Sequence, residues 1–187
     1  MIRSWEDYKA YVKADQSNFV GRGLRGQAFA DPICDQYLQR QYLRCLRMAE
    51  YAINCHHPLL KLYALWRLRR LGRISGFQIP PNVLGKGVTL FHWGTIIING
   101  EARIGRNATF QPNVVIGKNK KKGGSPQIGD NFYACAGARI FGEITIGHNV
   151  RIGPNCCVYK SIPDNCTVVG NPAVIVRKDG IKCKIKL

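Results

Sequence analysis

Apolar side chains recur at six-residue intervals through the second half of this chain. The residues that share the spacing are Ile104, Phe110, Ile116, Ile128, Ala134, Ile140, Ile146, Ile152 and Val158, with one interruption from Lys118 to Gln127. This period fits neither the roughly 3.6-residue turn of an α-helix nor the alternation of a β-strand. It is typical of a chain that climbs a three-sided prism with one short strand per face. The pattern therefore predicts a β-prism whose inward side chains stack from coil to coil.

Glycines and one insert punctuate this repeat. A glycine follows Ile104, Ile116, Ile128, Ile146 and Ile152, and we expect these glycines to fit tight corners of the prism. The insert 118–127 is rich in lysine and cannot lie on a face. We expect it to project as a charged loop that is placed to touch a ligand.

Residues 1–76 show helical spacings instead. Asp31-Pro32 is expected to begin one helix, and His57-Pro58 to separate it from a second helix, Leu59 to Leu71, that closes at Gly72. We therefore divide the chain into an N-terminal helical region, 1–76, and a prism domain, 77–187. The prism domain includes the projecting loop 118–127 and a C-terminal tail.

The net charge of +17 indicates an anionic partner, such as nucleic acid, a membrane surface or a polyphosphate ligand. The helix at 59–71 mixes basic with large apolar residues. It has two interpretations: contact with an anionic membrane surface, or packing against protein with its basic face in solvent. No motif that reads nucleic acid is recognisable, so nucleic acid is not the expected partner.

The eight cysteines follow no metal-binding spacing, because no CxxC occurs and Cys156-Cys157 is an adjacent pair. We expect reduced cysteines and no metal site. The first residues lack the apolar core of a signal peptide, and no apolar run is long enough to span a bilayer. The expected location is the cytoplasm, with peripheral membrane contact left open.

His92 stands where two phases of the repeat meet. Counting back in sixes from Ile104 places His92 inside the prism, whereas the phase of Leu84, Leu90 and Ile96 places it outside. The two phases differ by two residues, which predicts a register slip between His92 and Ile96 that Gly94 could absorb. Irregular backbone within a regular repeat often marks a functional site.

The stretch Phe91 to Gly105 resembles the active-site segment of serine acetyltransferases and their sugar-acetylating relatives. Ile116-Gly117, the lysine-rich insert, Pro126 to Asn131 and the ending Ile162 to Ala173 resemble the same family. The resemblance implies a left-handed parallel β-helix of hexapeptide repeats, so the chain is expected to be mainly β with an N-terminal α-helical region. It also implies O-acetyl transfer from acetyl-CoA, with His92 as the general base that deprotonates the acceptor hydroxyl.

The resemblance further implies where coenzyme A lies. The positions that match are Gly117, Lys118, Asn119, Ala136, Pro154 and Lys160. Prisms of this kind commonly form trimers with ligand clefts between neighbouring chains, so a homotrimer is expected.

Departures from the family bear on the acceptor. Phe77 replaces the aspartate that orients the histidine, Phe91 replaces the acidic residue before it, and Ser125 replaces a second histidine. Without these anchors for an amino acid, Phe91 and Trp93 are expected to bind a sugar. The interpretation preferred from the sequence is an O-acetyltransferase of a capsular or exopolysaccharide precursor, similar to colanic-acid acetyltransferases.

Two alternatives stay open at this point. One is serine O-acetylation in cysteine biosynthesis, and the other is a non-catalytic prism that acts as a scaffold. The group that orients His92 without the aspartate is also open, with Gln78, Asn82, Glu101 or a backbone carbonyl as candidates.

Overall fold

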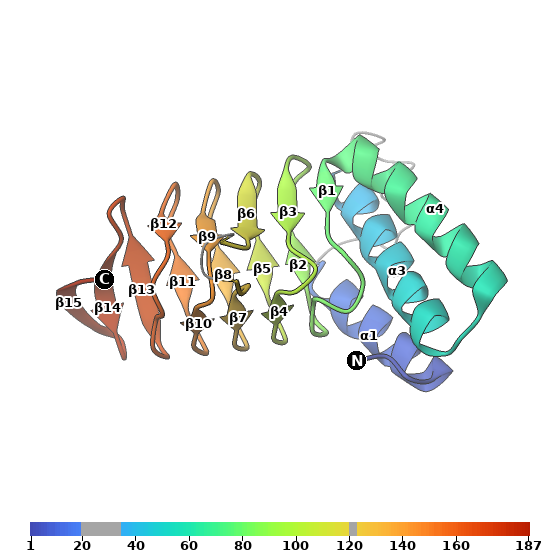
Figure 1. Cartoon of the computed structure of the whole chain (residues 1–187), viewed down its shortest axis with the longest axis horizontal. Coiled ribbons are helices and arrows are strands. Elements are labelled where there is room, and N and C mark those ends of the chain that lie inside the picture. Colours follow the sequence, from blue (N-terminus) through green and yellow to red (C-terminus); the bar gives the residue numbers. More distant parts are fainter. Residues whose placement is uncertain (20–34, 120–122) are drawn as a thin grey trace.

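The computed structural model describes residues 1–19, 35–119 and 123–187. Three helices lie together at one end of a long β-prism, and the C-terminus lies at the other end (Figure 1). The helices are α1 (Trp5–Ser17), α3 (Asp35–Asn54) and α4 (Pro58–Ser75). In the described part of the chain, helical residues outnumber strand residues, so the expectation of a mainly β chain is not confirmed.

The strands are short and follow one another around the prism. They are β1 (Phe77–Gln78), β2 (Thr89–Leu90), β3 (Ile96–Ile98), β4 (Arg103–Ile104), β5 (Thr109–Phe110), β6 (Val114–Gly117), β7 (Gln127–Ile128), β8 (Tyr133–Ala134), β9 (Arg139–Phe141), β10 (Thr145–Ile146), β11 (Arg151–Ile152), β12 (Cys157–Val158), β13 (Cys166–Val169), β14 (Val174–Lys178) and β15 (Ile181–Lys186).

These strands form three sheets, one per face. The first sheet has the order β1-β3-β6-β9-β12, the second β10-β7-β4, and the third β15-β14-β13-β11-β8-β5-β2. Pairing is parallel throughout the prism and becomes antiparallel only where β14 and β15 extend the third sheet. The sequence reasoning treated residues 166–187 as a tail and missed this terminal hairpin.

The six-residue pattern predicts the core correctly. All of its apolar positions are buried, and successive coils place them in register, for example Ile116 beside Ile140 and Phe110 beside Ala134. The residue two positions earlier also points inward, as Val114 does before Ile116. Each face therefore adds two buried side chains per coil to one continuous column.

Most corners have an asparagine with positive φ, whereas the predicted glycines, most of which lie in the same turns, have ordinary φ. Asparagines adopt positive φ at the turns, and the side chains of one edge form a hydrogen-bonded ladder through Asn107, Asn131, Asn149, Asn165 and Asp179. The glycines are required for close stacking instead. A Cβ on Gly129 would lie 2.9 Å from the backbone of Gly147 on the next coil.

Helix α4 begins at Pro58, one residue before the predicted start, and it continues through Gly72 to Ser75, with Gly76 as its C-cap. Gly76 has φ +81°, the left-handed conformation that ends many helices. Gly72 is needed for packing, because a Cβ there would lie 2.6 Å from the carbonyl oxygen of Phe77. The predicted helix start at Asp31-Pro32 lies outside the described residues.

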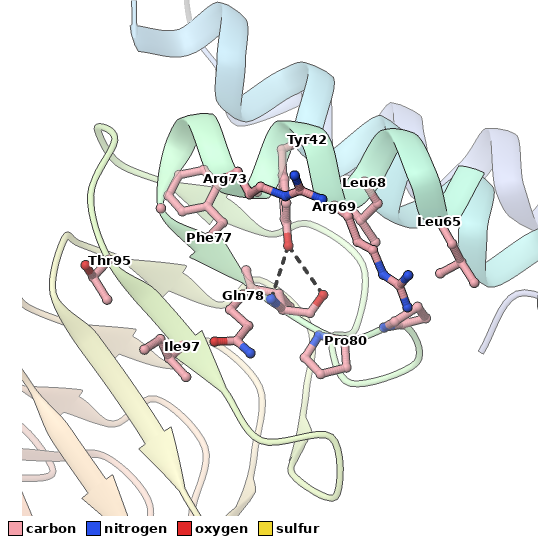
Figure 2. Close-up of a pocket in the computed structure, with 14 residues that line it drawn as sticks. Tyr42, Leu65, Leu68, Arg69, Arg73, Phe77, Gln78, Pro80, Thr95 and Ile97 are labelled. Carbon is pink, nitrogen blue, oxygen red and sulfur yellow. Dashed lines mark hydrogen bonds between the residues drawn. The ribbon is translucent and has the colours of Figure 1, made fainter. Parts of the chain in front are cut away.

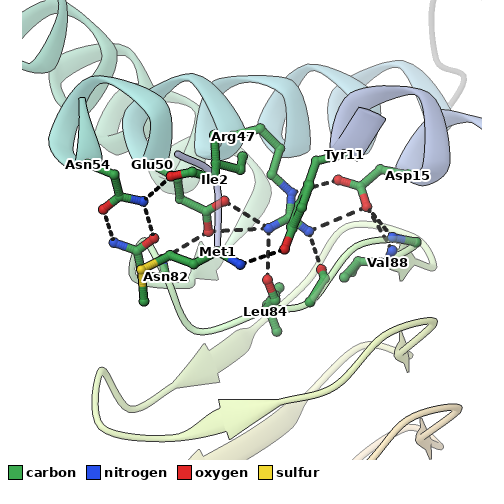
Figure 3. Close-up of polar contacts among 12 residues, drawn as sticks. Met1, Ile2, Tyr11, Asp15, Arg47, Glu50, Asn54, Asn82, Leu84 and Val88 are labelled. Atoms are coloured by element: carbon green, nitrogen blue, oxygen red, sulfur yellow. Dashed lines mark hydrogen bonds and ion pairs between the residues drawn. The ribbon is translucent and has the colours of Figure 1, made fainter. Parts of the chain in front are cut away.

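A buried arginine joins the helices to the first coil (Figure 3). Arg47 of α3 is fully buried and donates hydrogen bonds to the carboxylates of Asp15 and Glu50 and to the carbonyl oxygens of Leu84 and Gly85. Burial by itself lowers the pKa of Arg47, but the two carboxylates raise it above its ordinary value, so the guanidinium stays charged. This cluster satisfies backbone groups at the open end of the prism.

Helix α4 packs on α3 through one face and leaves the opposite face in solvent. Large apolar side chains are exposed on that outer face, namely Leu59, Leu62, Tyr63 and Trp66. None of the helices in the described ranges is both long enough and apolar enough to cross a bilayer.

Candidate active site

His92 lies in a turn that is longer than its counterpart on the next coil. The turn joins β2 to β3 and contains the five residues 91–95, whereas the turn from β5 to β6 contains the three residues 111–113. The two additional residues are the register slip that the sequence predicts. They leave His92 exposed and in the left-handed conformation, with φ +54°. Positive φ recurs along this edge, at Asn113 and Asn155, so the added length rather than the conformation sets the His92 turn apart.

Backbone hydrogen bonds hold both ends of this turn. The amide of Phe91 donates to the carbonyl of Phe110 (2.9 Å), and the amide of Gly94 donates to the carbonyl of Ser75 (2.9 Å). Gly76 packs closely against the turn, because a Cβ there would lie 2.9 Å from the carbonyl carbon of Gly94. The end of α4 therefore fixes the backbone that carries His92. Sequence reasoning missed this contact, although a glycine directly before the first strand was a signal for it.

The predicted acceptor-binding residues flank His92. Phe91 and Trp93 are 42% and 50% exposed, and the Phe91 ring centroid lies 6.3 Å from that of His92. Such exposed aromatic faces are able to cover a bound molecule and exclude water from it.

The predicted coenzyme A positions fall on two edges of the prism. Ala136 and Pro154 lie in the turns from the third sheet to the first, the same edge as His92. Gly117, Lys118, Asn119 and Lys160 lie on the edge between the first and second sheets. Part of the insert, 120–122, lies outside the described residues. One chain therefore does not bring these six positions together.

The candidates for orienting His92 lie in different places. Asn82 exchanges side-chain hydrogen bonds with Asn54 of α3, and Glu101 forms an ion pair with Lys118 (2.8 Å) on the other edge. Gln78 is exposed on β1 and pairs in register with Ile97 of β3, the strand that directly follows the His92 turn.

Two of the three positions that depart from the resembled pattern, Phe77 and Ser125, are packed into the structure, whereas Phe91 is exposed. Phe77 is buried and packs edge-on against Tyr42, with 5.1 Å between ring centroids. Ser125 is buried and donates a hydrogen bond to the side-chain oxygen of Asn99 (3.0 Å). Phe77 therefore serves the core, and its ring offers no polar group to a histidine.

Three parallel sheets closed around a six-residue repeat define the class of the fold, the hexapeptide-repeat left-handed β-helix. Comparisons then identify the proteins that this chain is similar to. No protein-family model matches it. Over 109 residues it is 40% identical to the serine acetyltransferase of Staphylococcus xylosus, covering 57% of this chain and 50% of that protein.

Solved structures agree with this similarity. The serine acetyltransferase of Neisseria gonorrhoeae in complex with serine matches 92% of this chain and 70% of that chain, with 28% identity and a TM-score of 0.67. The serine acetyltransferase of Brucella abortus in complex with coenzyme A matches 95% and 71%, with a TM-score of 0.72; at 24% identity it shows the shared fold. The chain spans about half the length of the curated relatives it matches.

Proposed function

We propose that this chain is an acetyl-CoA-dependent O-acetyltransferase with His92 as its general base. The observation that carries the proposal is the exposed His92 in the one lengthened turn of an otherwise regular edge. Similarity to serine acetyltransferases, one of them solved with coenzyme A, supports acetyl-CoA as the donor.

The reaction requires one proton acceptor and no metal. The imidazole of His92 takes the proton of the acceptor hydroxyl as its oxygen attacks the thioester carbonyl. The carbon–sulfur bond breaks, the acetyl ester forms, and the leaving coenzyme A thiolate takes the proton back from the imidazole. A histidine suits both steps because its ordinary pKa lies near neutrality.

L-Serine is the acceptor that the comparisons favour. The relatives are serine acetyltransferases, and two of the matching structures contain serine. The glycan acceptor preferred from the sequence has no support from them. One observation keeps it as a second candidate: Phe91 and Trp93 expose aromatic faces on both sides of His92, and aromatic faces pack well against sugar rings.

A homotrimer would bring the two coenzyme A edges together. His92, Ala136 and Pro154 on one chain would face Gly117 and Lys118 of the neighbouring chain across a cleft. The exposed lysines on that second edge would then meet the phosphates of coenzyme A. Sedimentation analysis tests the trimer directly.

The outer face of α4 supports contact with an anionic membrane surface. Its exposed Leu59, Leu62, Tyr63 and Trp66 share one face of the helix, and α4 contains no acidic residue. A second copy of this positively charged helix would be repelled, whereas anionic lipid would be attracted.

The central experiment measures thiol release from acetyl-CoA with L-serine and with sugar acceptors. His92→Ala should lower kcat by about 10²–10⁴-fold. His148→Ala is the matched control, because His148 is equally exposed but lies on another edge, where its Nδ1 accepts from the Asp130 amide. Full turnover by His92→Ala, or no thiol release with any acceptor, would contradict the proposal.

A further inference from the structure

A pocket of about 590 Å³ is lined by residues of α4, β1 and β3 (Figure 2). Its apolar wall includes Leu65, Leu68, Phe77 and Pro80. This volume lies in the range of small-molecule sites, which combine apolar walls with a few polar groups. The Tyr42 hydroxyl in the wall is already engaged with the backbone of Ile79, and burial raises its pKa, so it stays neutral.

The polar groups of the pocket are basic or neutral. Arg69 and Arg73 lie one helical turn apart on α4, and Figure 2 shows both side chains on the side of α4 that faces Gln78 and Pro80. Among the described residues that line the pocket, none is an aspartate or a glutamate. In the described ranges neither arginine takes part in an ion pair.

Arg69 and Arg73 are both exposed and have the i,i+4 spacing at which like charges disfavour each other, and a bound oxyanion would supply a counter-charge to both. Arg73 lies in the last turn of α4, where a cation also favours the helix dipole. That role does not extend to Arg69, because Arg69 lies one turn earlier. An oxyanion in the pocket would be able to accept hydrogen bonds from both arginine forks.

The pocket borders the His92 turn directly. Thr95, the last residue of the turn, lines the pocket together with Gly76. Gly76 also accepts a hydrogen bond from the amide of Ile96 (3.2 Å) and packs against Gly94. The pocket that the arginines line therefore extends to the backbone that positions the proposed base.

We infer that this pocket binds the anionic part of the acceptor, a carboxylate or a phosphate, through Arg69 and Arg73. The inference rests on the proposed acetyl transfer and adds to it the chemical class of the acceptor. A carboxylate would come from an amino acid such as L-serine, and a phosphate from a sugar phosphate. Both present oxygens that match the arginine fork.

The test compares two double variants of the full chain that remove the same charge. Arg69→Gln with Arg73→Gln removes the pocket arginines. Arg67→Gln with Arg70→Gln is the control, because Arg67 donates to the Tyr63 hydroxyl and Arg70 stacks over Trp66, outside the pocket. The first readout is binding of inorganic phosphate at low salt by calorimetry, which does not depend on turnover. The second is the KM for L-serine, for a sugar phosphate and for acetyl-CoA.

The parent and the control should bind phosphate, and the pocket variant should lose that binding. KM for the anionic acceptor should rise about tenfold or more for each arginine removed, while the KM for acetyl-CoA stays constant. The acceptor whose KM rises identifies the source of the anion. Phosphate binding that is absent in the parent or equal in both variants overturns the inference. So does a rise confined to the KM for acetyl-CoA. These results leave the His92 test unaffected, so the two proposals fail separately.

Discussion

Replacing Arg47 should destabilise the whole chain, because this residue compensates two buried carboxylates at once. Its Nε lies 2.8 Å from Asp15 and its Nη1 2.9 Å from Glu50, and all three side chains are at most 2% exposed. Arg47→Met keeps most of the side-chain volume and removes the charge and the donors. Asp15 and Glu50 then retain backbone donors but have no counter-charge.

The expected loss follows from the groups left behind. Removing one partner of a buried ion pair costs about 3–5 kcal/mol, and each buried carbonyl that loses its donor adds roughly 1 kcal/mol or more. Leu84 and Gly85 are the two carbonyls concerned. We therefore expect a decrease of about 5 kcal/mol in the free energy of unfolding, which is a large share of the ~5–15 kcal/mol available to a typical domain.

Urea denaturation followed by circular dichroism measures this decrease. Arg106→Met is the matched control, since Arg106 forms an ion pair of the same 2.8 Å length with Asp130 but is 63% exposed. Exposed pairs contribute little because water and salt screen them. Arg47→Lys, which keeps the charge but loses the fork, should fall between the parent and Arg47→Met. Equal midpoints for Arg47→Met and Arg106→Met would refute the argument from burial.

Three further predictions concern other regions. Gly76→Ala should slow acetyl transfer and lower the melting temperature, because its Cβ would meet Gly94. The control is Gly180→Ala, which should leave acetyl transfer unchanged, because Gly180 has nearly the same φ (+80°) but open space around it. Equal turnover of the two variants would argue against the contact between the end of α4 and the His92 turn. Burial raises the pKa of the Cys156 thiol to about 11, so its alkylation near pH 8 should be slow until the chain unfolds. The free energy of unfolding should fall as the pH rises from the ordinary thiol range toward 11, because only the unfolded chain loses the proton there. Rapid labelling of the native chain, measured by peptide mass spectrometry, would contradict this. Replacing Leu62 and Trp66 by serine should reduce sedimentation with anionic vesicles at low salt, and unchanged sedimentation, or no binding by the parent, would remove the membrane proposal.

The site could be located from the sequence only as far as the repeat extends. The clash between two phases around His92 reveals an irregular turn, because every inward position of a prism is fixed by its neighbours six residues away. The two counts place the His92 side chain on opposite sides of the prism wall, and only the structure shows that it is exposed. The contact that anchors the turn does not follow from either count, because Gly76 and Gly94 belong to different kinds of structure and share no period. The arginine pocket was missed for a related reason, since Arg69 and Arg73 look like ordinary solvent-facing residues of a basic helix.

By itself the sequence determined the prism, its buried column and the irregular turn at His92. These features depend on contacts that repeat at short and regular intervals, so local spacing encodes them. Tertiary structure alone decided how the helices close the prism and which groups meet there. Arg47 contacts Asp15 and Leu84 from 32 and 37 residues away, and a charged residue on an amphipathic helix carries no sign that it will be buried. Such contacts occur at a single place, where the helices meet a coil of the prism, so no regular spacing in the sequence predicts them.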